Sequence, residues 1–447
     1  MSGINKFIFI CGSACLLAAI SVMGATMVST NDTSAAPEPL TLADAQRYAV
    51  EDNWDILAAK SQVDAATAQL LLAREFPNPT LSLSTAKIGR SYAGTTEGND
   101  AWGRNYDSIA AVNQFIEIAG KRHDRQLAAR AGVLSAKARF MDAKRTLEQG
   151  MAKTYITALF AMENARSLAE SAGYMRHEAN IAEQQHAAGD LSEADMKTIE
   201  INADQFELQA KSAEAAAVQA RIAVQVLMGE NRPDGNWKPG DSLEYMVATV
   251  PQGGESETAT NEAARPDVLA AQTDLRAASE NLKLQKAERI PDPTLSVGVE
   301  HEPPGGAPGP DANTLNVGVS FPLPLWNQNK GNIQAAQAVV VQSRIALAQI
   351  QAQATADLAN AKSEYNEAYL RWLRYRDQTA PKSAQVRATM EYKYEKGAAT
   401  LLDLLNAEQT DNTVRLALAQ AMNDTASAVA DLTAAQAAVT ETEVEKE

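Results

Sequence analysis

The sequence predicts a mainly α-helical protein with a membrane β-barrel part, built from an internal duplication. Long stretches carry apolar residues at helical spacing, and only 5% of the residues are aromatic, which favours closely packed helices. Two shorter segments instead alternate apolar with polar residues, as the strands of a two-faced sheet do. The same order of motifs occurs in both halves of the 447 residues, which indicates a repeated plan.

The N-terminus is predicted to be a signal peptide over residues 1–36. Lys6 precedes an uncharged run from Phe7 to Val28, and small residues follow it. The run is also long enough to span a membrane as a helix, so an uncleaved anchor is the alternative. The two cysteines, Cys11 and Cys15, both lie in this segment. The mature chain therefore excludes disulfides and thiolate metal sites.

The charge of the chain excludes one class of partner. A net charge of −16 argues against nucleic-acid binding, because phosphate contacts need clustered Lys and Arg. The acidity fits either simple solubility or a surface that tolerates cations.

The first repeat is expected to cover residues 37–230. Helical periodicity begins at Thr41, a suitable N-cap, and Pro77 ends it. Alternation then predicts two strands, and the helical pattern resumes after Gly120. The elements predicted for this repeat are a helix over 41–76, a β-hairpin over 79–118, a long helix over 119–188 and a returning helix over 193–228.

A linker rich in Pro and Gly is expected over residues 231–261, and the second repeat over 262–440. The elements predicted for the second repeat are helices over 264–290, 327–380, 382–396 and 401–440, with a β-hairpin over 293–325. Residues 441–447 are expected to form an acidic tail.

Several pairs of motifs support the duplication. Asp55-Ile-Leu-Ala-Ala resembles Asp267-Val-Leu-Ala-Ala, and Pro77-Asn-Pro-Thr-Leu-Ser resembles Pro291-Asp-Pro-Thr-Leu-Ser. The turns at Gly189 and Gly397 match at a constant offset. Coincidence is a poor explanation of so many pairs in one order.

The strands are long enough to cross a bilayer when tilted, and their faces suit lipid on one side and a lumen on the other. A small soluble sheet packed on helices is the alternative. Open sheet edges in lipid leave backbone groups unpaired, and about eight strands are the practical minimum for closure. Four strands therefore cannot close alone, whereas three copies give twelve.

Two segments at the junctions of strand and helix carry a family resemblance: Gln114 to Arg122 (QFIEIAGKR) and Phe321 to Ile333 (FPLPLWNQNKGNI). With the duplicated layout, they resemble the TolC-type outer membrane factors, and more closely the heavy-metal resistance branch typified by CzcC and CusC. The resemblance implies a homotrimer with a twelve-stranded barrel, continued by a long helical barrel in the periplasm.

The resemblance also implies roles for residues near the two turns between long helices. Asp403 falls on a pore-aperture carboxylate and Asn406 where a second one is expected, while Asp195 and Tyr394 fall on positions that tie neighbouring coiled coils closed. Ala399 occupies the position of a gating arginine. The alternative for Asp403 is that it only caps or solvates its turn. The residues expected to dock an adaptor are Gly189, Asp190, Leu191, Gly397, Ala398 and Ala399.

No candidate enzyme site is found, because the four histidines do not cluster and no phosphate loop or nucleophile elbow is present. No cofactor or bound metal is expected. The resemblance implies the exit duct of a tripartite pump, with its barrel in the lipid of the outer membrane. The expected partners are a periplasmic adaptor and an inner-membrane transporter of the resistance–nodulation–division type. Heavy-metal cations are the expected cargo. The alternatives are a multidrug or type I secretion duct and, in another class, a periplasmic coiled-coil adaptor.

Overall fold

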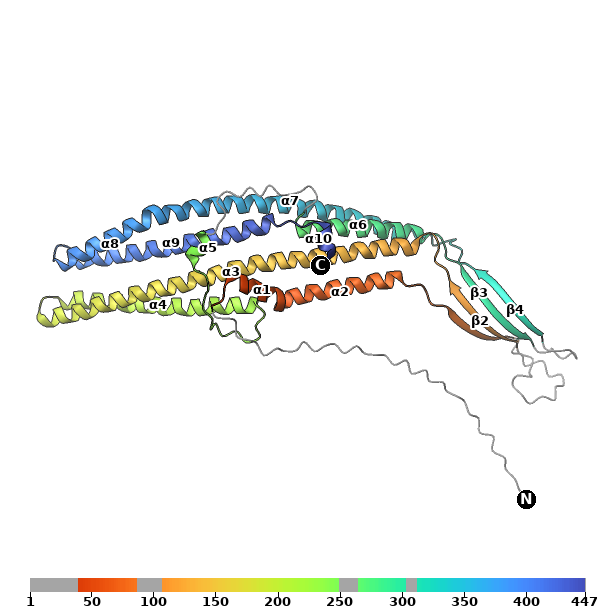
Figure 1. Ribbon diagram of the computed structural model, residues 1–447, viewed down its shortest axis with the longest axis horizontal. Coiled ribbons are helices and arrows are strands. Elements are labelled where there is room, and N and C mark those ends of the chain that lie inside the picture. The colour runs from red at the N-terminus through yellow and green to blue at the C-terminus, as the bar shows by residue number, and fades with distance from the viewer. Residues whose placement is uncertain (1–38, 87–106, 249–263, 303–311, 447) are drawn as a thin grey trace, which may run out of the picture. The chain divides into compact units, whose positions relative to one another are not determined.

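The computed structural model describes residues 39–86, 107–248, 264–302 and 312–446. All described residues lie within Glu38–Glu447, which forms one compact unit. The predicted signal peptide over 1–36 thus lies outside the described residues. In the described part, long helices dominate and four strands form a single sheet (Figure 1). None of the described helices combines the length and the apolar character needed to cross a membrane.

The first repeat contains one very long helix, α3, whose 68 residues correspond to roughly 100 Å. The sequence predicted this helix without a break, and the structure confirms it. The helices of this half are α1 (Leu42–Asp52), α2 (Trp54–Arg74), α3 (Lys121–Ala188), α4 (Glu193–Leu227) and α5 (Leu243–Ala248).

The second repeat follows the same plan with one difference in its long helix. A π-helical turn, η1 (Tyr375–Thr379), separates α7 from α8, where the sequence predicted only a helix boundary near Pro381. The helices of this half are α6 (Pro266–Ala287), α7 (Lys330–Arg374), α8 (Ala380–Glu395), α9 (Leu401–Gln436) and α10 (Glu441–Lys446).

The prediction of one helix over 41–76 is wrong at Asn53. Thr41 caps α1 as expected, but Asn53 has an extended backbone, and its side chain accepts hydrogen bonds from Asp55 N and Ile56 N at the start of α2. Asn53 Nδ2 also donates to Leu227 O at 2.9 Å. An asparagine that can cap a new helix thus ends the preceding one.

The expected linker and acidic tail are more ordered than predicted. Within 231–261, Trp237 is buried, stacks on Tyr155 and donates to Arg221 O, and α5 follows it; residues 249–261 lie outside the described part. The tail forms α10, and Val444 is buried against Leu269 and Ala270. One apolar side chain in an acidic segment is therefore enough to dock it.

The four strands form one antiparallel sheet in the order β1-β2-β3-β4, which confirms both predicted hairpins and joins them through β2 and β3. Both end strands, β1 and β4, therefore have one unpaired edge among the described residues. The strands are β1 (Thr80–Ala86), β2 (Asp107–Phe115), β3 (Thr294–Glu302) and β4 (Ala312–Ser320).

The two faces of the sheet differ in chemistry along matched rows. One face carries a row of apolar side chains that are all exposed: Leu81, Val112, Val297 and Val317. The opposite face carries hydrogen-bonded polar groups, because Asn113 bonds to both Ser82 and Ser296 and Asn316 donates to Glu300. The alternation predicted from the sequence is confirmed.

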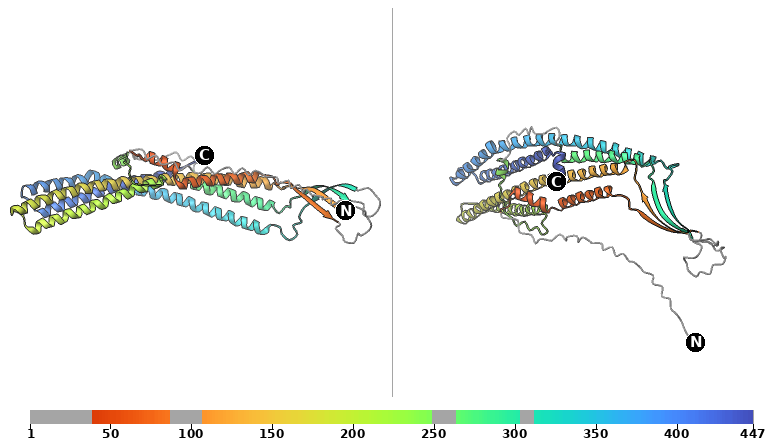
Figure 2. Two further views of the ribbon diagram at one scale, coloured as in Figure 1. Left: turned by 90° about the horizontal axis from the view of Figure 1, so that it is seen from below. Right: turned by 45° about the vertical axis from the view of Figure 1, so that its right-hand side comes forward.

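Helix α3 is the centre of the helical part, since it packs against α2, α4, α6 and α9. Its contacts are made mostly by small residues such as Ala131, Ala138 and Ala158, which allow close approach of the helices. The pairs α3–α4 and α8–α9 form two helical hairpins whose turns lie at the end away from the sheet (Figure 2). These two turns hold the residues singled out by the sequence.

Candidate functional site

The turn between α3 and α4, the first tip (residues 185–195), is built by glycine and a helix cap. Gly189 has a positive φ of 88°, and the N–H groups of Gly189 and Asp190 donate to the carbonyls of His186 and Gln185. Ser192 then caps α4 by accepting from Asp195 N at 3.1 Å. A left-handed glycine followed by a capping serine gives a short, rigid reversal.

The turn between α8 and α9, the second tip (residues 393–403), repeats this geometry. Gly397 has a φ of 71°, and Gly397 and Ala398 donate to Tyr394 O and Lys393 O. Thr400 caps α9 by accepting from Asp403 N at 3.3 Å. The predicted correspondence of the two turns therefore holds atom for atom in these hydrogen bonds.

Asp403 is exposed, and its carboxylate closes a capping box with Thr400. Oδ2 of Asp403 accepts from Thr400 N at 3.0 Å and from Thr400 Oγ1 at 2.6 Å. These hydrogen bonds hold the pKa of Asp403 below its usual value, with a smaller contribution from the charge of Lys393. Asp403 thus stays ionised and is fixed in place, as a capping residue must be and as an aperture charge requires.

Asn406 follows Asp403 on the same exposed side of α9, because residues three apart share a helix face. The buried side of the same stretch carries Leu404, Ala407 and Asp411. The structure therefore places Asp403 and Asn406 near one another on the exposed side of α9.

Asp195 and Tyr394 lie on different tips, and no hydrogen bond joins them among the described residues. Asp195 Oδ2 accepts from Ser192 Oγ at 2.7 Å within its own helix cap. Tyr394 is half-buried, and burial raises the pKa of its phenol, with a further increase from the charge of Glu178 on α3. Tyr394 therefore faces the first helical hairpin from the second.

The sequence reasoning missed a buried polar network between α8 and α9. Ser383 Oγ donates to Asp411 Oδ1 at 2.8 Å, and Arg415 Nε lies 2.8 Å from Asp411 Oδ2. Arg387 lies 3.4 Å from both Asp411 and Glu408. The available signal was Asp411 itself, a charged residue on the apolar stripe that Leu404 and Ala407 begin.

Burial shapes the electrostatics of this network. It raises the pKa of Glu408, and the nearby guanidinium of Arg387 offsets this only in part. Nε of Arg387 is buried and makes no hydrogen bond, which leaves the guanidinium incompletely satisfied. A packed helix interface with partly unsatisfied charge is costly to maintain.

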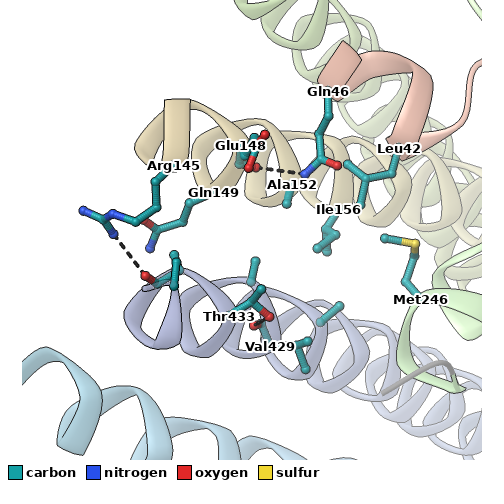
Figure 3. Close-up of a pocket in the computed structure, with 14 residues that line it drawn as sticks. Leu42, Gln46, Arg145, Glu148, Gln149, Ala152, Ile156, Met246, Val429 and Thr433 are labelled. Carbon is teal, nitrogen blue, oxygen red and sulfur yellow. Dashed lines mark hydrogen bonds between the residues drawn. The ribbon is translucent and has the colours of Figure 1, made fainter. Parts of the chain in front are cut away.

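A crevice of about 300 Å³ lies in the helical part, away from the two tips, between α1, α3, α5 and α9 (Figure 3). Leu42, Ile156, Met246 and Val429 line its apolar side. Two of its polar groups are already paired, because Gln46 donates to Glu148 O and Arg145 donates to Ala434 O. The crevice therefore offers a ligand mostly apolar contact, and none of the tip residues reaches it.

The described residues contain no group of three or more His, Cys, Asp or Glu side chains able to hold a metal ion. The polar network at Asp411 is a set of ion pairs and hydrogen bonds.

Comparisons with known proteins agree with this arrangement. The model of the outer membrane efflux protein family matches residues 47–230 and 260–438, one segment in each repeat. Among curated relatives, the cobalt-zinc-cadmium resistance protein CzcC of Cupriavidus metallidurans is 24% identical over 382 residues, which are 83% of this chain and 84% of CzcC.

Two further likenesses widen the comparison. The pyoverdine export outer membrane protein OpmQ of Pseudomonas aeruginosa is 26% identical over 395 residues, 83% of this chain and 81% of OpmQ. A crystal structure of CusC superposes with a TM-score of 0.71 at 18% identity, over 88% of this chain and 91% of CusC. The predicted fold and the predicted family resemblance are both confirmed.

Proposed function

Because the chain belongs to the outer membrane efflux protein family, we propose that it is the homotrimeric exit duct of a tripartite pump that exports heavy-metal cations. The family places the chain in the outer membrane and makes it a channel, as predicted, and not an enzyme. It also decides against the alternative of a periplasmic adaptor.

The observation that carries the proposal is the sheet. Among the described residues, its four strands have an apolar face, a polar face and two unpaired edges. Such a sheet is stable in lipid only after closure, and three copies supply twelve strands, above the minimum of about eight. The polar face then lines a lumen, and the helices continue the duct into the periplasm.

The second tip supplies the charge for selectivity. Three copies of Asp403 around a narrow axis attract cations and repel anions, and Asn406 extends the same polar face. We assign Asp195 and Tyr394 to the contacts that keep the tips together. The exposed turn residues of both tips, Gly189–Leu191 and Gly397–Ala399, are the docking surface for a periplasmic adaptor, and an inner-membrane resistance–nodulation–division transporter supplies the driving force.

Channel recordings in planar bilayers test the aperture. Asp403→Asn removes the charge and keeps a side-chain oxygen that can accept from Thr400 N in the capping box. Asp204→Asn is the matched control on the exposed surface of α4. We expect the reversal potential in a salt gradient to move toward zero for Asp403→Asn only. Equal reversal potentials in all three proteins would refute the aperture.

The cargo is tested separately in a strain that lacks the protein. We expect it to lose resistance to zinc, cobalt or cadmium, or to copper or silver, with resistance restored by the intact chain. The likeness to OpmQ supports a second candidate, export of an organic metal chelator. Unchanged metal resistance together with reduced secretion of a chelator would favour that cargo.

A further inference from the structure

The two repeats meet inside the chain along a seam, defined here as the contact of β2 and α3 with β3 and α6. We propose that this seam recurs between copies, with β4 and α7 of one copy against β1 and α2 of the next. The recurrence fixes the register of β4 on β1 and gives Lys330 of α7 the contact that Lys121 makes inside the chain. The inference rests on the proposed homotrimer and adds the residues that join its copies.

Matched residues show that α2 is exposed where its counterpart α6 is buried in the seam. Leu269 and Ala270 of α6 are 7% and 5% exposed, because they pack against Ala138 of α3 and Val444. Their counterparts in the Asp-Ile-Leu-Ala-Ala motif of α2 are Leu57, which is 38% exposed, and Ala58, which is also exposed. The counterpart of α3 is α7, so α7 of a second copy is the occupant that fits.

Helix α7 has an apolar surface that suits this role. Val340 and Leu347 match the buried Ala131 and Ala138 of α3 at the offset that relates Lys330 to Lys121, and both are apolar and only half-buried. The described sheet ends at β4 beside this helix. Burying these side chains against α2 of another copy removes apolar area from water, in the way the seam does for α3 and α6.

The register follows from the strand pairs inside the chain. Leu81 faces Val112 in the first hairpin and Leu295 faces Val319 in the second, so Val319 is the counterpart of Val112. In the seam Val112 faces Val297, whose counterpart in β1 is Leu83. Val319 of one copy therefore faces Leu83 of the next. Both lie on the apolar face, which a slip of one residue would not allow.

The adjoining pair on the polar face is Ser320 of one copy and Ser82 of the next. Its counterparts in the seam are Asn113 and Ser296, whose side chains are hydrogen-bonded at 2.6 Å. Direct contact of the two serine side chains across the new seam is therefore expected.

The lysine contact is likewise inferred from a contact that is present inside the chain. Lys121 starts α3 after Gly120, which has a positive φ, and its Nζ donates to Ile290 O and Asp292 Oδ2, both at 2.6 Å. Lys330 starts α7 after Asn329, which also has a positive φ of 57°. Lys121 is 6% exposed, whereas Lys330 is exposed.

The counterparts of Ile290 and Asp292 are Phe76 and Asn78, from the matching Pro-x-Pro motifs. Lys330 Nζ of one copy thus donates to Phe76 O and Asn78 Oδ1 of the next. Because an amide replaces the carboxylate, this contact is weaker than that of Lys121 with Asp292.

Cysteine cross-linking tests the register in a chain whose two natural cysteines lie within residues 1–36. The pair Ser82→Cys with Ser320→Cys places the two Cβ atoms opposite one another, close enough for a disulfide. The matched control, Ser84→Cys with Ser320→Cys, is diagonal and too far apart. Within one chain these positions lie on opposite edge strands, so any disulfide joins two copies.

After oxidation, we expect the first pair to give a covalent trimer on a heated non-reducing gel, and the control pair and both single variants to give monomers. Preferential cross-linking of the control pair would overturn the register, even in a protein that still conducts. A protein that is monomeric in mild detergent would overturn the proposed trimer itself.

The lysine contact is tested by a gain of stability. Asn78→Asp restores to Lys330 the carboxylate that Lys121 has, and we expect the trimer to dissociate at a temperature higher by about 3 °C. In a Lys330→Met background the same substitution should give no increase, as a double-mutant cycle requires. An equal increase in both backgrounds would show that Asn78 does not contact Lys330.

Discussion

The two helical hairpins, α3–α4 and α8–α9, have equivalent tips but different interiors. Both tips use a left-handed glycine and a capping hydroxyl with an aspartate three residues later. Inside the hairpins, the offset that relates Gly189 to Gly397 also relates Met175 to Ser383 and Ala203 to Asp411, and all four of these residues are buried. An apolar interior in one repeat is thus a hydrogen-bonded, charged interior in the other.

The helices that lead to the tips also differ between the two repeats. Helix α3 runs to its tip without interruption, whereas η1 interrupts the path from α7 to α8. π-helical turns are frequent at functional sites, and partly unsatisfied buried charge is costly to maintain. From this difference we expect the packing of the second hairpin to be less stable than that of the first.

The largest expected effect is at Asp411. Asp411→Ala leaves Arg387 and Ser383 without their buried partner, and we expect a loss of about 3 kcal/mol in the stability of the α8–α9 contact. Hydrogen exchange of peptides from residues 380–415 measures it. Ser383→Met with Asp411→Ala recreates the pair of the first hairpin, and should recover most of the loss. No recovery would show that the two interiors are not interchangeable.

The glycines of the tips should give a smaller effect that is equal in the two hairpins. Gly189→Ala and Gly397→Ala each force a Cβ into the left-handed region, at a cost of about 1–2 kcal/mol. Neither site has a neighbour within 4 Å of the added Cβ, so backbone conformation alone sets the cost. Hydrogen exchange at the two tips measures both, and a clear inequality would contradict their equivalence.

The smallest expected effect is a dependence on pH that has opposite signs in the two hairpins. Because burial raises the pKa of Glu408, the folded hairpin favours the protonated carboxyl. The stability that this adds is present below the unfolded pKa and is lost as pH rises through the raised folded value. We expect hydrogen exchange in α9 to slow on acidification, and Glu408→Gln to remove this response. The peptides of α4 provide a comparison of opposite sign: the hydrogen bond from Arg176 lowers the pKa of Glu207, so its stabilising contribution is lost as pH falls.

The sequence was sufficient for features encoded by local chemistry. Gly189 and Gly397 marked the tips, Pro77 and Pro291 marked the strands, and alternation gave the two faces of the sheet. The capping role of Asp403 was also readable, since Thr400-Leu-Leu-Asp403 matches a capping-box pattern.

Features that depend on tertiary partners were not predictable in this way. The break at Asn53 depends on its bond to Leu227, and α10 depends on a pocket for Val444. Pro381 marked a helix boundary beside η1, but it did not specify a π-helical turn. At the candidate site, Asp411 was missed because its role depends on Ser383 and Arg387 of another helix.

The two unpaired edges of the sheet also constrain how the protein is made. A newly exported chain presents exposed backbone groups on β1 and β4 beside apolar side chains such as Leu83 and Leu315, which are 75% and 70% exposed. Such an edge pairs with any available strand, so an unassembled chain is prone to aggregate. For the proposed homotrimer, assembly therefore competes with loss of single chains to misassembly and proteolysis, and assembly is favoured by a higher concentration of chains.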